Sequence, residues 1–474
     1  MEYTATERIL LELSNPEVVP LSLAQIISEE IKEFKASQAR WDMLESEQYY
    51  RNRSDVQRKT VRLEGRSNAK IERPILKKLI DQKTDFLLSK PFTVNTENEA
   101  YGAAINTVFD AQFRRRVKAF GKQAILSGIA YLQPWFDEGK LAFSLLPSAE
   151  VIPLWADDEH EKLSAFIRFY DRTVYIGNRR CTVSHAELWW PGGVKYFKTD
   201  AFSGRGATDY KVDTEHGSTE NDYTEPHFMV GDVAYNWETP PLIWLRYNTE
   251  ELPLCYFVKD LIDDINWQNS VTADVLRDVA KFIFVLKNYG GQDLGDFMRK
   301  LREAYAIQVE GDGGVDKLAA DVSVDAVMAF LDNDRRDLFD YASAVDTKDP
   351  DLGNASGVAI NFRYMDLAAD CDALGTELKA AFARLKIFLD YYLALTGKGD
   401  FANDSFEVVF NTDMPVNEAD VINNARNSAG LISRQTIVEN HPWVVDAQEE
   451  LRRLEAEQQQ TDVYVGAFGA GGGA

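Results

Sequence analysis

The sequence predicts an α+β protein, in which helices and strands occupy largely separate stretches of the chain. Apolar residues recur at helical spacing over residues 21–50 and again after Pro253. Between these stretches, from residue 131 to residue 246, many segments alternate with a period of two, as strands do. At 474 residues the chain is also too long for a single compact core, so two or three structural regions are expected.

The first quarter of the chain predicts two helices separated by a basic stretch. A helix is expected over residues 21–50, with Ser22 as its N-cap. The stretch from Arg51 to Arg73 is rich in Arg and Lys, which is unusual in so acidic a chain. A second helix is expected to begin at Pro74, a favourable first-turn residue, and to end at Lys90-Pro91.

The next region predicts a helix followed by a sheet. The helix covers residues 115–133 and is broken at Gly128. A hairpin turn is expected at Asp137-Glu138-Gly139. Further strands are expected at 164–176, 181–190, 194–199 and 232–246, with an exposed loop over 203–222.

The second half of the chain predicts long helices around a compact insert. A helix over 257–283 carries Asp260, Asp263, Asp264, Asp274 and Asp278, mostly opposite its apolar side, which holds Leu261, Ile262, Ile265, Val275, Leu276 and Val279. Short strands and Gly-rich turns follow, including strands at 282–286 and 306–309, and another helix begins after Ser323. Residues 346–358 are expected to form a loop before the longest helix, which ends near Thr396 at Gly397-Lys398-Gly399. A strand at 405–411, a helical C-terminal region and a disordered Gly/Ala-rich tail at 466–474 complete the chain.

Composition and charge limit the classes of function. A formal net charge of −24 argues against a protein that grips DNA statically, although not against a channel along which DNA slides. Cys181, Cys255 and Cys371 are far apart, so we expect small buried thiols rather than disulfides or a zinc site. No apolar run reaches about 18 residues, and the first residues lack the layout of a signal peptide, so we expect no membrane span and a protein made in the cytoplasm.

A search for catalytic motifs gives a negative result. Gly121-Lys122 and Gly397-Lys398 lack the glycine spacing of a phosphate-binding loop, and no dinucleotide, nucleophile-elbow or zinc-protease motif is present. The five histidines lack partners at metal-ligand spacing, so we expect them to be structural or surface residues. Adjacent acidic pairs such as Asp263-Asp264 point about 100° apart on a helix and do not converge. We therefore expect neither a cofactor nor an enzymatic activity.

Several segments of the chain form a pattern by their order and spacing. The segments are Tyr49-Tyr50, Ser67-Asn68-Ala69-Lys70-Ile71, the stretches 80–91 and 121–131, Leu146-Pro147-Ser148-Ala149-Glu150-Val151-Ile152-Pro153, Ala165-Phe166-Ile167-Arg168-Phe169-Tyr170 and residues 260–266. This pattern resembles the portal proteins of tailed phages, most closely the branch typical of siphophages of Gram-positive hosts. The resemblance covers about residues 40–440 and is carried by the order and spacing of the segments, since no single motif is diagnostic. Ser89 stands where that family often has Gly.

The resemblance implies a portal fold with named parts. Residues 1–255 would form an α/β wing. Helices at 256–283 and 323–345 would form a stem around a small α/β clip at 284–322. Residues 346–358 would be the tunnel loop, 359–411 a long wing-crossing helix and strand, and 412–474 a helical crown with a disordered tail.

The resemblance also implies a function: a ring of twelve subunits at one capsid vertex, which serves as a passive channel for packaging and ejecting double-stranded DNA. In the tunnel loop, Lys348 and Asn354 would touch phosphates, and Gly353, Ser356 and Gly357 would let the loop approach DNA. The acidic stem faces would line the channel or face solvent, where repulsion from phosphates lets DNA slide.

The expected partners are other copies of the chain, the large subunit of the terminase, the neck proteins that complete the head, the scaffold and the major capsid protein. The terminase motor and then the neck proteins would dock at the clip, where the candidate residues are Tyr289, Gly290, Gly291, Arg299, Lys300 and Arg302. The expected location is the virion, after assembly in the cytoplasm of the host bacterium.

Alternatives remain open on the sequence alone. The loop at 346–358 could be a plain linker that leads into a helix. The basic stretch 51–73 could bind acidic faces of neighbouring subunits, scaffold or capsid, or it could be a solvated loop. The alternative function is another ring-forming virion or scaffold protein without a DNA channel. An enzyme with a carboxylate site is the least favoured class.

Overall fold

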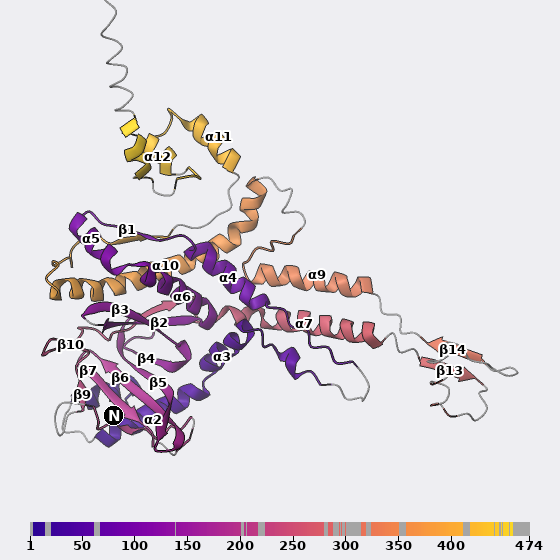
Figure 1. Cartoon of the computed structure of the whole chain (residues 1–474), viewed down its shortest axis with the longest axis horizontal. Helices are drawn as coiled ribbons and strands as arrows, with labels where there is room; N and C mark the ends of the chain where they lie inside the picture. The colour runs from indigo at the N-terminus through magenta and orange to yellow at the C-terminus, as the bar shows by residue number, and fades with distance from the viewer. Residues whose placement is uncertain are drawn as a thin grey trace, which may run out of the picture. The chain divides into compact units, whose positions relative to one another are not determined.

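The computed structural model describes most of the chain in two units (Figure 1). The described residues are 3–14, 20–60, 67–137, 139–200, 203–204, 206–216, 223–278, 283–287, 293, 295, 299, 314–318, 324–349, 357–410, 418–439, 441–444, 447, 449–454 and 456–457. The main unit comprises residues 1–344 and 371–411, and the second unit comprises 345–370 and 412–474. Within the described ranges, no helix combines the length and apolar character needed to cross a lipid bilayer.

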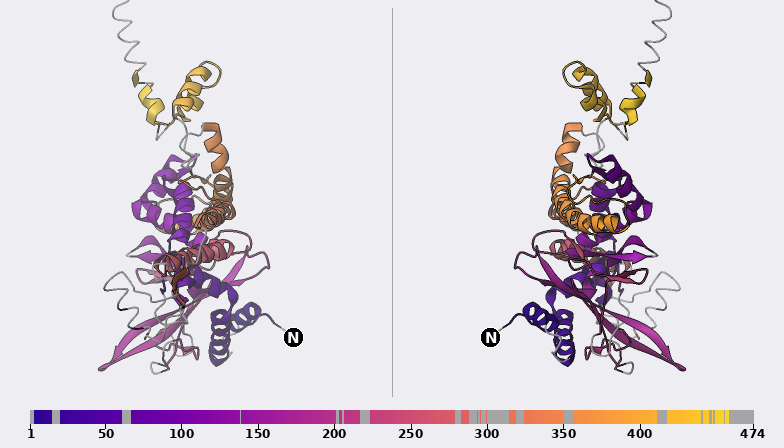
Figure 2. Two further views of the ribbon diagram at one scale, coloured as in Figure 1. Left: turned by 90° about the vertical axis from the view of Figure 1, so that its right-hand side faces the viewer. Right: turned by 90° about the vertical axis from the view of Figure 1, so that its left-hand side faces the viewer.

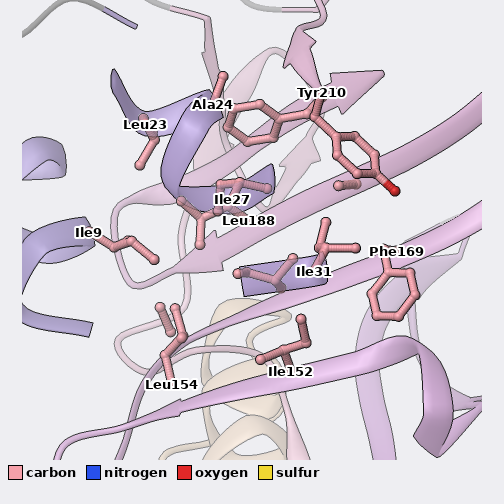
Figure 3. Packing of buried hydrophobic residues seen from close by; sticks show 14 residues of the cluster. Ile9, Leu23, Ala24, Ile27, Ile31, Ile152, Leu154, Phe169, Leu188 and Tyr210 are labelled. Carbon is pink, nitrogen blue, oxygen red and sulfur yellow. The ribbon is translucent and has the colours of Figure 1, made fainter. Parts of the chain in front are cut away.

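An antiparallel sheet forms one half of the main unit. Its strand order is β4 (Val151–Trp155), β5 (Leu163–Ile176), β6 (Arg179–Trp190), β7 (Gly193–Lys198) and β8 (Lys211–Val212), and β9 (Thr224–Glu225) also pairs with β7. Helices α1 (Ala5–Ser14) and α2 (Pro20–Ala36) pack on this sheet (Figure 3). Buried residues alternate along the strands, and Leu23, Ile27 and Ile31 face them at four-residue steps. Strand residues two apart and helix residues four apart therefore form one apolar core.

A second, three-stranded sheet lies next to a group of helices. Its order is β12 (Ile243–Arg246), β2 (Ile129–Asp137) and β3 (Lys140–Leu146). The helices are α3 (Gln38–Tyr50), α4 (Ile75–Leu88) and α6 (Ala111–Ser127). Gly128 joins α6 directly to β2 with φ +81°, a conformation that disfavours other residues.

Helix α10 (Gly357–Leu395) begins in the second unit and continues into the main unit from residue 371. Phe382 of α10 packs against Phe92, Phe109 and Phe113 with ring centroids 5.0–6.3 Å apart. Close to this cluster lie α5 (Glu99–Val108) and the strand pair β1 (Thr93–Asn95) and β15 (Glu407–Val409). Aromatic rings from both halves of the sequence thus close one core.

Two long helices run side by side in opposite directions: α7 (Leu254–Asp278) and α9 (Val324–Tyr341) (Figure 1). Between them in sequence lies an antiparallel pair, β13 (Ile283–Lys287) and β14 (Gly314–Leu318). The remaining elements are the hairpin β10 (Phe228–Val230) and β11 (Val233–Tyr235), the short helices η1 (Asp55–Arg58) and η2 (Ser148–Glu150), and α11 (Glu418–Ser428) and α12 (Arg434–Glu439) in the second unit.

The structure confirms most of the predicted elements and corrects several boundaries. The mixed α+β class is confirmed, as are the hairpin between β2 and β3 and the helix α9. The helix predicted at 21–50 is two helices, because Ser37 caps α3 by accepting the amide hydrogen of Arg40, and Ser22 lies inside α2 instead of capping it. The stretch predicted as one strand at 232–246 is β11 and β12, which belong to different sheets. Helix α1 was not predicted.

Candidate functional site

The basic segment 51–73 is called the strap below, and its described residues, 51–60 and 67–73, lie along α7. Three polar residues at four-residue steps on α7 accept hydrogen bonds from alternate backbone amides of the strap. The amides of Ala69, Ile71 and Arg73 donate to Asp274 Oδ1 (2.6 Å), Ser270 Oγ (2.9 Å) and Asn266 Oδ1 (3.1 Å), respectively. Four helical residues rise about 6 Å and two extended residues span roughly 6.7 Å, so the two repeats stay nearly in step. This side of the helix therefore acts as the hydrogen-bonding partner of an extended segment.

The strap is also fixed at its first residues. The Ser54 hydroxyl donates to Glu72 within the strap (2.9 Å) and accepts a hydrogen bond from the Asn266 side-chain amide (3.2 Å). Asn266 and Ser270 are fully buried beneath it. Buried polar groups cost free energy unless they are paired, and these contacts supply the pairing.

An ion pair between Lys59 and Asp274 joins the strap to α7 near the end of the helix. The two side chains are 7% and 15% exposed, so water screens the pair only weakly. Burial alone would raise the pKa of the Asp274 carboxyl, but hydrogen bonds from Lys59 and from the Ala69 amide hold that pKa below its usual value. The ammonium of Lys59 also lies 5.6 Å from the centre of the Trp267 ring.

These contacts change the interpretation of both the strap and the acidic helix. The described strap residues that contact α7 do not form a solvated loop. Lys59 is paired with Asp274 within the same chain, so it is not free to bind another subunit. The acidic side of α7 is only partly open to solvent. Asp263 accepts hydrogen bonds from Tyr49 (2.7 Å) and Lys259 (2.7 Å), whereas Asp260 is exposed. Leu276, predicted on the apolar side, is 60% exposed, and the side chains of Asp278 and Val279 lie outside the described residues.

Two carboxyl groups, Asp264 of α7 and Asp334 of α9, lie next to each other where the two helices pack. Asp334 of α9 is 6% exposed and its Oδ2 has no hydrogen-bond partner among the described residues. Burial raises the pKa of the Asp334 carboxyl, and the neighbouring Asp264 of α7 raises it further. Two carboxylates at such a contact repel unless one of them holds a proton. The packing of this helix pair is therefore linked to pH.

The end of α9 is held by a buried cation. Ser343 adopts φ +44°, which ends the helix, and the amide of Ala344 donates back to the Phe339 carbonyl (2.9 Å). Lys83 of α4 is fully buried and donates from Nζ to the Ser343 carbonyl (3.1 Å). A cation at a helix C-terminus interacts favourably with the unpaired carbonyls there. The contact fixes the point from which the chain continues into residues 345–356.

Part of the loop predicted at 346–358 is described. Asp346 forms a turn, in which its carbonyl accepts the Asp349 amide (3.1 Å) and its carboxylate accepts the amide of Lys348 (3.0 Å). The Lys348 side chain is exposed. Gly357 is the first residue of α10 rather than a loop residue, because first-turn amides lack intrahelical partners and glycine is tolerated there. Gly353, Asn354 and Ser356 lie outside the described residues.

The predicted docking segment is described mainly by its two strands, β13 and β14. Ile283 pairs with Leu318 and Lys287 pairs with Gly314, so the ends of the insert meet as a ladder. Arg299 is an exposed helical residue. Tyr289, Gly290, Gly291, Lys300 and Arg302 lie outside the described residues, as does the strand predicted at 306–309.

The histidines and cysteines have structural surroundings. Burial lowers the pKa of His227 to about 4, and its ring accepts the Trp237 amide hydrogen (2.9 Å). His160 lies 2.7 Å from the Glu251 carboxylate and stacks on Trp155. The three cysteines are buried free thiols, as predicted. Among the described residues, no cluster of three or more His, Cys, Asp or Glu side chains is arranged to hold a metal ion.

The sequence alone missed the contact between the strap and α7. Its signal was present as Asn266, Ser270 and Asp274, three polar residues at helical spacing. A polar stripe on a helix ordinarily faces water. Only the tertiary structure shows that this one faces an extended segment of the same chain.

Comparisons with known proteins identify the family of the chain. The profile of the family described as "Phage portal protein, SPP1 Gp6-like" matches residues 31–464. The chain is 30% identical to the portal protein of Bacillus phage SPP1 over 390 residues, which cover 81% of this chain and 75% of that protein. It is 22% identical to the portal protein of Clostridium phage phiCD119 over 434 residues, or 86% and 91% of the two chains. The chain therefore belongs to the SPP1 Gp6-like family of phage portal proteins.

Proposed function

We propose that twelve copies of this portal protein form a closed ring at one capsid vertex, through which double-stranded DNA is packaged and later ejected. The observation that carries the proposal is the family match over residues 31–464. The antiparallel pair α7 and α9 supports it, since cyclic symmetry would turn one such pair per subunit into a tube.

Each part of the fold would have its own role in the ring. Residues 1–255 would form the wing, α7 and α9 the stem, and the insert between them the clip. The loop that begins at Asp346 would form a collar around DNA, with exposed Lys348 near the phosphates. Gly353, Asn354 and Ser356 remain proposed DNA-facing residues, and Gly357 would act only as the start of the helix behind them.

The acidic character of the chain suits a passive conduit. A net charge of −24 gives the chain a net repulsion for phosphates, so DNA would slide instead of binding. The pumping would come from a separate ATPase, the large subunit of the terminase, because the sequence contains no phosphate-binding loop motif.

The clip would dock the terminase first and the neck proteins afterwards, while the wing would contact scaffold and major capsid protein. Assembly would take place in the cytoplasm of the host bacterium, and the finished ring would be part of the virion. The exposed Arg299, together with Lys300 and Arg302, supports docking of an acidic partner surface.

The ring is tested by negative-stain electron microscopy of the purified chain at moderate salt. We expect rings with a central hole and twelvefold symmetry. Rings without a hole would favour the alternative, a virion or scaffold protein that does not conduct DNA. A monomer at high concentration in light scattering would contradict both functions.

Docking is tested by replacing Arg299, Lys300 and Arg302 with Ala in the full chain and measuring binding of the terminase large subunit by interferometry. We expect at least a tenfold loss of affinity with intact rings, because desolvated charge pairs at an interface carry much of the binding free energy. The control replaces the exposed Lys32, Lys140 and Lys379, which carry the same charge outside the insert. Equal affinity of both variants and wild type would contradict docking at these residues.

A further inference from the structure

Strands β5 and β6 continue well past the strands that flank them. β4 pairs with β5 only as far as Arg168, and β7 pairs with β6 only from His185. The ladder between β5 and β6 nevertheless continues from Asp171, opposite Ser184, to Ile176, opposite Arg179. No other strand in the described part of the chain pairs with this extension, and Figure 2 shows it running beyond its neighbours. We call residues 171–184 the ribbon.

The ribbon is an ordered arm rather than a loop. Its register has no shift, and its two strands turn at Gly177-Asn178, where Gly177 has φ +59°. At its base, the Ser184 hydroxyl donates to Asp171 (2.6 Å) and the Ser184 carbonyl accepts the Thr199 amide (2.9 Å). Five strand residues beyond that base reach about 17 Å. An ordered ribbon loses little conformational entropy when it binds.

The tip of the ribbon is exposed on both faces. Cys181 and Val183 point to one face and are buried, at 8% and 7% exposure, but Arg179, opposite Ile176 on that same face, is exposed. Tyr175 stands directly opposite Arg180 on the other face, and Tyr175 is 73% exposed. Tyrosine and arginine are, with tryptophan, the side chains most enriched among interface residues that carry the binding free energy. The tip of the ribbon thus has the composition of a contact surface.

The ribbon is basic in an acidic chain. It carries Arg172, Arg179 and Arg180, all exposed, against one acidic residue, Asp171. The whole chain has a net charge of −24, so any second copy carries an excess of acidic side chains. Opposite charges favour the encounter of these two surfaces and fix their orientation.

We propose that the ribbon contacts an acidic surface of the neighbouring copy of this chain, and this inference rests on the proposed ring. A ring places a second copy beside each subunit at high effective concentration. In a heterologous contact of this kind, the arm of one subunit meets a different surface of the next, and repetition closes the ring. Tyr175 would supply buried area, and Arg179 and Arg180 would pair with carboxylates.

Nucleic acid is the competing partner for an aromatic and arginine-rich arm. With three arginines and one aspartate, the ribbon attracts DNA only weakly, because the net negative charge of the chain repels phosphates. The same long-range field attracts the arm to another copy of the chain. The charge balance therefore favours a protein partner.

The first experiment changes the exposed side chains at the tip of the ribbon in the full chain. Tyr175→Ser, Arg179→Glu and Arg180→Glu are combined, and Arg179→Lys with Arg180→Lys is the matched control that keeps the charge. Sedimentation velocity over a range of concentrations and salt measures ring assembly. We expect the concentration for half-assembly to rise at least tenfold in the reversed variant and less than threefold in the control. Unchanged assembly of the reversed variant would overturn the inference.

A second experiment does not depend on weakened assembly. Asn178→Cys places a reactive thiol at the ribbon tip, and the three native cysteines are buried. A photo-crosslinker attached there should join adjacent copies in assembled rings, and peptide mapping should locate the link in an acidic segment. Links only within one copy would overturn the inference. If the wild-type chain forms no rings at all, the proposed function fails instead, so the two failures are distinguishable.

Discussion

At the scale of single residues, Gly128 shows how one position directs the chain from helix to sheet. It ends α6, and its carbonyl accepts the Tyr247 amide (2.8 Å) at the edge of the following sheet. A Cβ atom at Gly128 would lie 1.9 Å from the Glu251 carbonyl oxygen. The backbone passes so close that no side chain fits.

Gly128→Ala should therefore destabilise the main unit by more than about 3 kcal/mol, because backbone atoms on both sides must shift. Gly139→Ala is the matched control, since Gly139 has nearly the same positive φ (+80° against +81°) but nothing within 4 Å of an added Cβ. The control should lose only about 1 kcal/mol from backbone strain. Urea unfolding followed by tryptophan fluorescence measures both, and equal losses would show that crowding at Glu251 is unimportant.

Lys59 and Asp274 likewise show that the effect of a residue depends on its surroundings in the fold. Either charge left alone in so buried a place would be costly, and the pair persists because the Ala69 amide also donates to the carboxylate. The lowered pKa of Asp274 means that this stabilisation is present above the unfolded pKa and is lost as pH falls through the folded one.

At the scale of elements, the contact between α7 and α9 has the opposite dependence on pH. Because the folded-state pKa of Asp334 is raised, its favourable contribution is complete below the ordinary Asp pKa and is lost as pH rises through the folded value. Ionisation of Asp334 places its negative charge beside Asp264 of the facing helix. The helix pair is thus less stable when Asp334 is ionised than when it is protonated.

Asp334→Asn should stabilise the helix pair at pH 8 by about 1 kcal/mol and change little near pH 3.5, because the amide carries no charge at either pH. Hydrogen exchange of α9 amides at matched chemical exchange rates measures the effect. Asp332→Asn, at an exposed position on the same helix, is the control and should change stability by less than about 0.5 kcal/mol. Faster exchange in Asp334→Asn at pH 8 would mean that the carboxylate has a stabilising partner.

The elements that the sequence predicted well are those whose signals are local. The turn between β2 and β3, the termination of α10 at Gly397 and the start of α9 each depend on a few adjacent residues. The break at Ser37 was missed because apolar residues continue at helical spacing on both sides of it. The strap was missed because its hydrogen-bond partners lie about 200 residues away. Pairing of that kind depends on the tertiary fold, because a polar stripe on a helix looks the same in sequence whether it faces water or another segment.

At the scale of the whole molecule, the main unit is assembled from two distant parts of the chain. Residues 371–411 belong with residues 1–344, although 26 residues of the second unit intervene. Helix α10 contributes Leu374, Leu378, Phe382, Leu385 and Leu389, all at most 2% exposed. Tyr101 of α5 donates to Asp390 of this helix (2.7 Å). The core of the main unit is therefore complete only after α10 has been made.

A chain that ends at residue 411 should consequently keep the main unit folded, whereas one that ends at residue 344 should not. Each buried Leu or Phe contributes about 2 kcal/mol to the free energy of unfolding. Losing five of them would remove stabilisation comparable with the whole stability of a typical domain, roughly 5–15 kcal/mol. Circular dichroism and limited proteolysis distinguish the results: the longer chain should unfold cooperatively near the full-length temperature, and the shorter one should be digested without a protected core. A cooperative transition in the 1–344 chain would show that the sheets and α1–α6 are stable without α10. In that case the long helix would be an addition to the main unit rather than part of its core.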